Sequence, residues 1–254
     1  MKVAWCLFGQ PRLYKKGYEI ISNFINFNKD CTFDFFYHTW FDQSLAGTYY
    51  NCSTWRYIPI EDLLIENNLI ENINNLYNPV SYMFEQPKVF DNEKYLKYHM
   101  LSSGKPEFIQ NINNTISNVY SKYKSFEVLE NHIEKTKEKY DIVISSRFDL
   151  LINFSLDLKT LDLNKIHTMV GGPNRLYISD HFVLSNFDMM KKYSSAYENL
   201  ELFLSKTEYI NYLNKIGAGP NFAVENIMTG NLLNYYDDLY SIIYLDPQIP
   251  NFVN

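Results

Sequence analysis

The sequence predicts an α/β fold in which a mixed, mostly parallel central sheet is flanked by helices. The chain opens with a short apolar run, Val3 to Phe8, that is closed by a Gly-Gln-Pro-Arg turn. A stretch with helical spacing follows, and then a second apolar run from Phe33 to Trp40. This β-α-β order favours parallel strands with a right-handed crossover. Strand-like and helical patterns continue to alternate as far as Leu245.

The remaining elements can be placed in chain order, with one weak region. Residues 43–104 show irregular loops with short helices, one of them starting at Pro59, and we interpret them as an insertion within one domain that spans 1–254. Beyond it we expect helices at 105–139, a strand at 140–152, short strands at 166–170 and 180–184 separated by a Gly-Gly-Pro turn, helices at 187–204 and 222–233, and a closing strand at 239–245.

Composition excludes several classes of partner. Hydrophobic residues make up 46% of the 254 positions, which is enough for a sizeable core. The formal charge is −6 with no block of like charges, and this argues against a nucleic-acid partner or an anionic membrane surface. A small anionic ligand remains compatible, provided that the positive charge is local. The three cysteines, Cys6, Cys31 and Cys52, lack metal-binding spacing and suggest buried free thiols of a reducing compartment.

The sequence also predicts where the protein works. It holds no apolar stretch of about 20 residues that would cross a bilayer. Its first residues do not have the pattern of a signal peptide, because their apolar run is short and leads into a polar turn. We therefore expect a protein of the cytoplasm, or of the host cytoplasm if the source is viral, without integral membrane contact.

Polar and aromatic residues gather where the first two strands end. In an open α/β sheet, ligands bind beyond the carboxyl ends of the strands. After the first strand, Gly9 allows close backbone approach, Gln10 can hydrogen-bond a base edge and Arg12 can pair with a phosphate. At the end of the second, Trp40 could stack on a base or sugar with His38 as a hydrogen-bond partner. The alternative is a plain turn with an exposed arginine, beside a core aromatic and a satisfied histidine.

The stretch YDIVISSRFDLLI carries two opposite charges near the end of a buried strand. Alternation along the strand puts Arg147 and Asp149 on one face. A carboxylate at a strand tip is a natural ligand for Mg²⁺ or Mn²⁺, which prefer oxygen and bridge to phosphates. The alternative is a structural ion pair between the two residues.

Two further acids could accept a proton from an attacking hydroxyl. Asp180 stands at the start of a strand, and Glu225 lies in the first turns of a late helix. The alternative for Glu225 is an acid favoured there by the helix dipole. The sequence has no GxGxxG, Walker A, GxSxG or Cys/His metal pattern, which removes the commonest dehydrogenases, nucleotide hydrolases, serine hydrolases and zinc enzymes.

Taken together, these motifs resemble sugar-nucleotide-dependent glycosyltransferases of the GT-A fold, in particular viral and bacterial enzymes of polysaccharide synthesis. Those enzymes begin with a strand and "GQPR", continue with "DxFxHTW" and carry "YDxVIxxRxDL" near the middle. The corresponding stretches here are CLFGQPR, FDFFYHTW and YDIVISSRFDLLI, followed by SDHFVLSNFDMMKKYSSAY and PNFAVENIM. The resemblance covers most of the chain except residues 43–104.

The resemblance implies a role for each matched position. The nucleotide pocket would be lined by Gly9, Gln10 and Arg12 with His38 and Trp40 nearby, and the nucleotide sugar would contact Asn118, Tyr120 and Ser121. Arg147 and Asp149 would stand where the family has its Asp-x-Asp metal motif. Arg147 replaces the first acid, so that Mn²⁺ or Mg²⁺ would rest mainly on Asp149, and Arg147 could do part of the cation's work.

The implied reaction is the transfer of a sugar from a nucleoside-diphosphate sugar to a glycan or similar hydroxyl acceptor. Inversion is the first expectation and retention is the alternative, because the sequence does not fix the face from which the acceptor approaches. Glu225 matches the late acid that serves as the base in inverting members, and Asp180 is the second choice. Two alternatives stay open. One is a catalytically inert module that binds nucleotide sugars or glycans, and the other is a nucleotidyltransferase, for which GQPRLYKKGY supplies only part of the expected glycine-rich basic loop.

Overall fold

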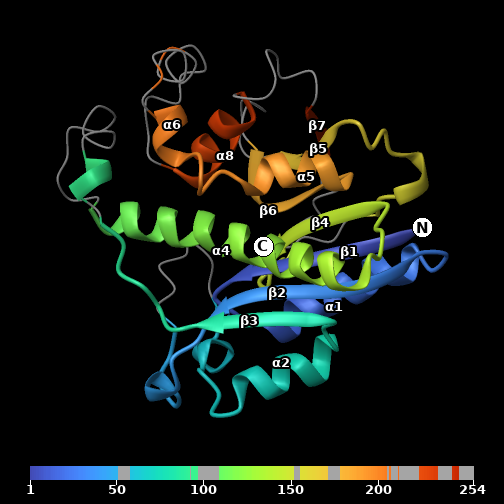
Figure 1. The fold of residues 1–254 in the computed structure, drawn as a ribbon. Coiled ribbons are helices and arrows are strands. Elements are labelled where there is room, and N and C mark those ends of the chain that lie inside the picture. The colour runs from blue at the N-terminus through green and yellow to red at the C-terminus, as the bar shows by residue number, and fades with distance from the viewer. Residues whose placement is uncertain are drawn as a thin grey trace, which may run out of the picture.

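A seven-stranded sheet forms the centre of the structure (Figure 1). The structure is a computed structural model that describes residues 1–50, 58–91, 93–96, 109–151, 155–170, 178–204, 206, 211, 223–233 and 242–245. The strands are β1 (Lys2–Gly9), β2 (Thr32–Trp40), β3 (Ser81–Glu85), β4 (Ile142–Arg147), β5 (Ile166–Val170), β6 (Ile178–Ser185) and β7 (Ile242–Leu245). They lie in the order β3-β2-β1-β4-β6-β5-β7.

The sheet is mostly parallel. Strands β1, β2, β3 and β4 pair in parallel, as do β5 and β7, whereas β6 pairs antiparallel with both β4 and β5. One reversed strand in seven gives a mixed sheet, and helices flank it on two faces. The predicted class, a mixed and mostly parallel α/β sheet flanked by helices, is therefore confirmed.

Helices cover both faces because the strands are apolar on both sides. The α-helices are α1 (Tyr14–Phe27), α2 (Leu69–Tyr77), α4 (Ile109–Thr136), α5 (Phe187–Ser194), α6 (Leu200–Leu204) and α8 (Val224–Leu233), with short 3₁₀ turns at Gln43–Leu45, Ile60–Leu63 and Leu158–Thr160. Along β1, Trp5 packs in the core under α1 and α2, whereas Cys6 packs in the core under α4, α5, α6 and α8. Within the described residues, no helix combines the length and apolar character needed to cross a membrane.

Two predicted elements differ from the structure. Residues 43–104 were expected to hold only loops and short helices. The nine-residue helix α2 agrees with this expectation, whereas the edge strand β3 does not. Strand β3 escaped detection because it lies at the sheet edge, where Tyr82 and Phe84 are about half exposed and no buried apolar run forms. The helix expected at 187–204 is two helices, α5 and α6, separated by turns at 195–199. The predicted Gly-Gly-Pro turn and Cys52 lie outside the described residues, whereas Cys6 and Cys31 are buried free thiols as predicted.

The chain changes direction across the sheet between β1 and β4. Strands β2 and β3 follow β1 on one side of it in the sheet, whereas β4, the next strand in sequence, lies on the other side of β1. Such a switch point opens a crevice at the carboxyl ends of the two strands concerned, where ligands bind in open α/β sheets. Because β6 is reversed, its first residues join the same edge.

Candidate functional site

Four charged side chains meet at the switch point between β1 and β4. Arg147, the last residue of β4, donates from Nε and Nη2 to the two carboxylate oxygens of Asp149 at 2.6 and 2.7 Å. Arg12 reaches the same carboxylate with its Nε at 2.7 Å. The Nη1 of Arg147 lies 3.2 Å from Oδ2 of Asp180, and His181 lies on the other oxygen of Asp180, with 3.3 Å between Nε2 and Oδ1. Arg12, Asp149, Arg147 and Asp180 thus form a continuous chain of opposite charges, and the imidazole ring of His181 lies at its end.

Strand ends bring this chain of charges together. Strand β4 ends at Arg147 and the backbone turns at once, so that the guanidinium group can fold over Asp149 two residues on. Asp180 arrives from the start of β6, which shares this edge because β6 runs antiparallel to β4. The sequence predicted that Arg147 and Asp149 would share one face of a strand. The structure places Asp149 in the turn after the strand and brings the two side chains into a bidentate pair.

The two aspartates are ionised in this environment. Burial alone would raise the pKa of Asp149, but Arg147 and Arg12 outweigh burial and hold that pKa below its usual range. Burial likewise raises the pKa of Asp180, and His181, Arg147 and Lys122 outweigh it and lower the pKa. The cluster is therefore a set of fixed charges that the protein holds nearly dry.

The donor set in the described part of the chain does not fit a bound divalent cation. No group of three or more His, Cys, Asp or Glu side chains suited to a metal is found there. Both oxygens of Asp149 already accept hydrogen bonds from arginine. The positive charge next to Asp149 comes from Arg147 and Arg12, and the binding of Mn²⁺ or Mg²⁺ stays a prediction.

A second group of predicted residues forms a hydrogen-bonded relay behind the switch point. The backbone N–H of Gly9 donates to Oγ of Ser121 at 2.8 Å, and that oxygen lies 2.8 Å from Nδ1 of His38. The Nε2 of His38 lies 3.0 Å from Glu85 at the end of β3. Gly9 has a φ of +93°, a conformation that side-chain-bearing residues rarely adopt, and this lets β1 turn sharply at its end.

His38 is neutral in this relay. It is completely buried, and burial lowers its pKa to about 4 although the nearby Glu85 carboxylate pulls the pKa upward. A neutral ring donates from Nε2 to Glu85 and accepts from Ser121 at Nδ1, which satisfies both nitrogens. His38 therefore links the ends of β1, β2 and β3 to helix α4.

Trp40 and Tyr120 pack against each other beside the relay. Their rings are stacked, with centroids 5.5 Å apart and planes 22° apart. The Tyr120 hydroxyl donates to Glu85 at 2.8 Å and accepts from Lys88 at 2.8 Å. Trp40 is only 4% exposed and packs as a buried residue at the end of β2. The ring of Tyr120 is the more accessible of the two.

Glu225 and Lys122 face the cluster from the helical layer above it. Glu225 lies in the first turn of α8 and is half buried. Burial, and then the charge of Asp180, raise its pKa, which is the direction that suits a proton acceptor at neutral pH. Lys122 of α4 lies near enough to Asp180 and Glu225 for both to act on its charge.

Lys122 was not among the site residues predicted from the sequence, although its position in the helical pattern indicates that it is buried. Lys122 falls on the apolar stripe of α4 between Val119 and Phe126, at the spacing that faces the core. A lysine on such a stripe must be buried. Gln10, in contrast, is exposed at the turn after β1, and its predicted hydrogen bond to a base edge stays a prediction.

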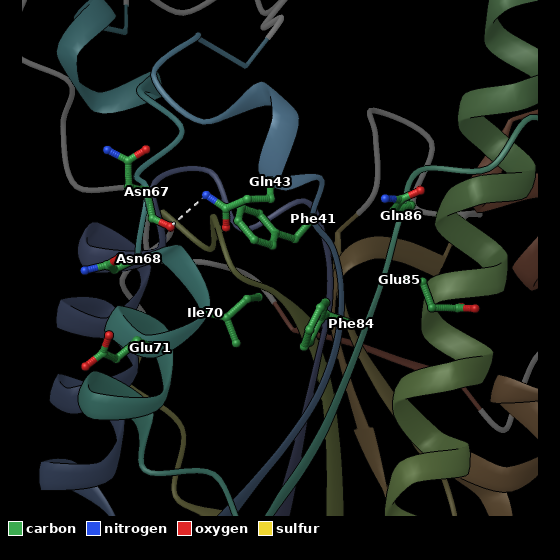
Figure 2. Close-up of a pocket in the computed structure, with 9 residues that line it drawn as sticks. All are labelled: Phe41, Gln43, Asn67, Asn68, Ile70, Glu71, Phe84, Glu85 and Gln86. Carbon is green, nitrogen blue, oxygen red and sulfur yellow. Dashed lines mark hydrogen bonds between the residues drawn. The ribbon is translucent and has the colours of Figure 1, made fainter.

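A pocket of about 570 Å³ opens beside the relay, at the carboxyl ends of β2 and β3 (Figure 2). Figure 2 shows Phe41, Gln43, Ile70 and Phe84 around its centre, whereas the side chain of Glu85 points away toward α4. The lining residues are Phe41, Gln43, Asn67, Asn68, Ile70, Glu71, Phe84, Glu85 and Gln86. None of them is positively charged, so this pocket suits a neutral polar ligand better than an anion.

Comparison with known proteins gives matches among solved structures only. No model of a known family and no curated protein sequence matches the chain. Among solved structures, an active-site mutant of LgtC, a GT-A glycosyltransferase, superposes with a TM-score of 0.40 and 12% sequence identity, covering 91% of this chain and 69% of that one.

Proposed function

We propose that the protein is a glycosyltransferase that moves a sugar from a nucleoside-diphosphate sugar to a hydroxyl group of a glycan. The observation that carries this proposal is the position of Arg12 and Arg147 at the switch point between β1 and β4, the place where an open α/β sheet binds its ligand. The family resemblance of the strand-end motifs agrees with it.

Arg147 supplies the charge that a departing diphosphate needs. Among the described residues it uses three of its five N–H groups on Asp149 and Asp180, so two remain for phosphate oxygens. The carboxylates hold the guanidinium group in a fixed orientation. Fixed donors in a nearly dry site stabilise developing negative charge without reorganising, and this is the main source of catalysis in such displacements.

Glu225 is the proposed base, with Asp180 as the second choice. Glu225 takes the proton of the acceptor hydroxyl while the acceptor oxygen forms a bond to the anomeric carbon. The bond between that carbon and the phosphate oxygen breaks, and the nucleoside diphosphate leaves with the electron pair. Asp180 is less suited to this role, because its lowered pKa and its contact with Arg147 make it a poor proton acceptor.

The neutral pocket beside the relay is the proposed site for a part of the glycan acceptor remote from the reacting hydroxyl, because none of its lining residues comes from α8, which carries Glu225. Its amide side chains both donate and accept hydrogen bonds, as sugar hydroxyls require, and Phe41 and Phe84 offer rings for the apolar face of a sugar. The pocket volume of about 570 Å³ falls within the usual range for small-ligand sites.

Binding and turnover test the proposal separately. Nucleoside diphosphates and their sugar derivatives should raise the melting temperature of the protein, because a ligand that binds only the folded state stabilises it. The absence of any shift with millimolar UDP, GDP, ADP or CDP would refute the donor assignment. Glu225→Gln should keep donor binding and lose transfer, and full transfer by that variant would move the base elsewhere.

A binding module without catalysis is the second candidate. The observation that favours it is the closed bidentate pair of Arg147 and Asp149, which occupies the position where a metal carboxylate was predicted. Slow hydrolysis of a nucleotide sugar separates the two candidates. An enzyme hydrolyses its donor measurably and loses this activity in Asp149→Ala, whereas a binding module leaves the donor intact.

A further inference from the structure

Lys122 is the most unusual charged residue in the described part of the protein. Its side chain is buried in the middle of α4, with 1% of the residue exposed, and its Nζ has no hydrogen-bond partner among the residues that the structure describes. The ammonium lies over the ring of Phe8, 4.8 Å from the ring centroid, at the end of β1. A ring offsets part of the cost of burying a cation, but it leaves the three N–H donors of the ammonium without acceptors.

The same face of α4 carries a second unsatisfied group. The Oδ1 atom of Asn118 is buried and also lacks a hydrogen-bond partner among the described residues. Asn118 precedes Lys122 by four residues, so the two side chains are neighbours on the helix surface. Ser121, between them in sequence, holds the backbone of Gly9. A buried donor and a buried acceptor therefore lie about one turn apart on α4, and neither pairs with the other.

Buried polar groups are normally paired, and unpaired ones cost folding free energy. Lys122 is held near Asp180 and Glu225, whose charges favour the ammonium, and Arg147 opposes it, but none of the three forms a hydrogen bond with it. Salt-bridge formation thus does not explain the lysine. An oxygen-rich anion entering at the switch point would satisfy it.

We infer that Lys122 and Asn118 form part of the donor site, in which Lys122 binds a phosphate oxygen of the nucleoside diphosphate and Asn118 binds a hydroxyl of the attached sugar. This inference rests on the proposed function. It adds Lys122 to the binding residues, and it gives a specific partner to Asn118, which the family resemblance already implied as a contact of the nucleotide sugar. A phosphate supplies acceptors and a neighbouring sugar hydroxyl supplies a donor, which is the combination that the two unpaired groups require. Lys122 then faces the leaving group while Glu225 faces the acceptor.

The test compares Lys122→Met with Lys124→Met, a matched control on the same helix that removes a lysine paired with Glu127. The probe is whichever of UDP, GDP, ADP and CDP stabilises the wild-type protein most, together with its monophosphate. Lys122→Met should weaken diphosphate binding by about ten- to a hundredfold, the value of a hydrogen bond to a charged group, and should weaken monophosphate binding less. Lys124→Met should leave both affinities unchanged.

A structural role predicts a different result. If Lys122 only supported the fold, its replacement would lower the melting temperature of the ligand-free protein. Removing an unpaired buried charge should instead leave that temperature equal or raise it. Wild-type diphosphate affinity in Lys122→Met would overturn the inference and leave the proposed function intact, whereas failure of the wild-type protein to bind any diphosphate would overturn both.

Two more variants secure the result. Lys122→Gln keeps a polar end of similar length and should show the same loss of diphosphate affinity, and failure of both variants to fold would assign the lysine to structure and overturn the inference. Asn118→Ala should weaken binding of the nucleotide sugar several-fold and leave binding of the diphosphate unchanged. Equal losses for both ligands would contradict the assignment of Asn118 to the sugar.

Discussion

Gly17 of α1 lies directly against the backbone of Phe148, so that a Cβ atom on Gly17 would stand 1.8 Å from the Phe148 carbonyl oxygen. Helix α1 can approach the turn after β4 only because this position has no side chain. The same turn carries Asp149, and the close packing therefore fixes the carboxylate that holds Arg12 and Arg147.

Gly17→Ala should destabilise the protein by about 1–3 kcal/mol, because a backbone oxygen cannot move away as a flexible side chain can. Urea denaturation measures the loss. The control is Asn23→Ala, an exposed position of the same helix, where alanine should be neutral or slightly stabilising. Equal stability of Gly17→Ala and wild type would contradict the tight contact.

Asp149→Asn should cost about 3–5 kcal/mol of folding free energy, because it removes the nearly buried carboxylate charge that two partly buried guanidinium groups share. Asp30→Asn is the matched control, since its ion pair with Lys159 is exposed and its loss should change the urea midpoint little. A small effect of Asp149→Asn would show that water or another group replaces the carboxylate.

The addition of Mn²⁺ tests the prediction that a divalent cation binds Asp149. Both oxygens of Asp149 are bonded to arginine, so we expect Mn²⁺ to add little to the thermal stabilisation that a nucleoside diphosphate produces. The measurement is the melting temperature with diphosphate in EDTA and in millimolar Mn²⁺. A large manganese-dependent increase that disappears in Asp149→Asn would instead support a metal on this carboxylate.

His38 should make stability dependent on pH. Its folded pKa is about 4 because of burial, whereas the unfolded value is about 6.5. Between these values the unfolded chain binds a proton that the folded protein does not, so stability falls as pH decreases through this window, by about 3 kcal/mol in total. His38→Gln should remove this part of the dependence in urea titrations from pH 7 to pH 4. An unchanged slope would indicate that His38 is protonated in the folded protein.

Phe84→Ala tests the proposed acceptor pocket. Phe84 is 50% exposed, so its removal should change stability little while it weakens binding of neutral oligosaccharides on a glycan array by about tenfold. Phe27→Ala, at the end of α1 and 54% exposed, is the control for the loss of an exposed ring. Equal glycan binding by Phe84→Ala and wild type would remove the acceptor from this pocket.

The sequence predicted those parts of the fold that are written in local patterns. The apolar runs of β1, β2 and β4 and the polar residues at their ends were found because burial on both faces leaves a continuous signal. Strand β3 was missed because an edge strand with exposed Tyr82 and Phe84 has no such run. Pairing across the sheet, which decides that β6 runs backward, depends on contacts distant in sequence.

The candidate site, like the fold, could be predicted only where residues close in sequence carry the signal. Arg147 and Asp149 could be recognised as a pair from their spacing, but the contact of Arg12 with Asp149 joins residues 137 positions apart. The burial of Lys122 could have been predicted from its place on the apolar stripe of α4, but only the structure shows that it lies over Phe8 and that its Nζ has no hydrogen-bond partner among the described residues. Function at this edge thus depends on tertiary packing that no single motif encodes.

The reversal of β6 makes ligand binding a property of the whole folding unit. Residues from β1, α4, β4, β6 and α8 reach the switch point only when the sheet is complete, since Asp180 is supplied by the strand that runs against its neighbours. A fragment that ends before β6 would lack the partner of Arg147 and could not assemble the pocket. Ligand binding at the switch point should therefore be coupled to cooperative unfolding of the whole sheet. A bound ligand should slow hydrogen exchange in β1 as strongly as it slows exchange in α8.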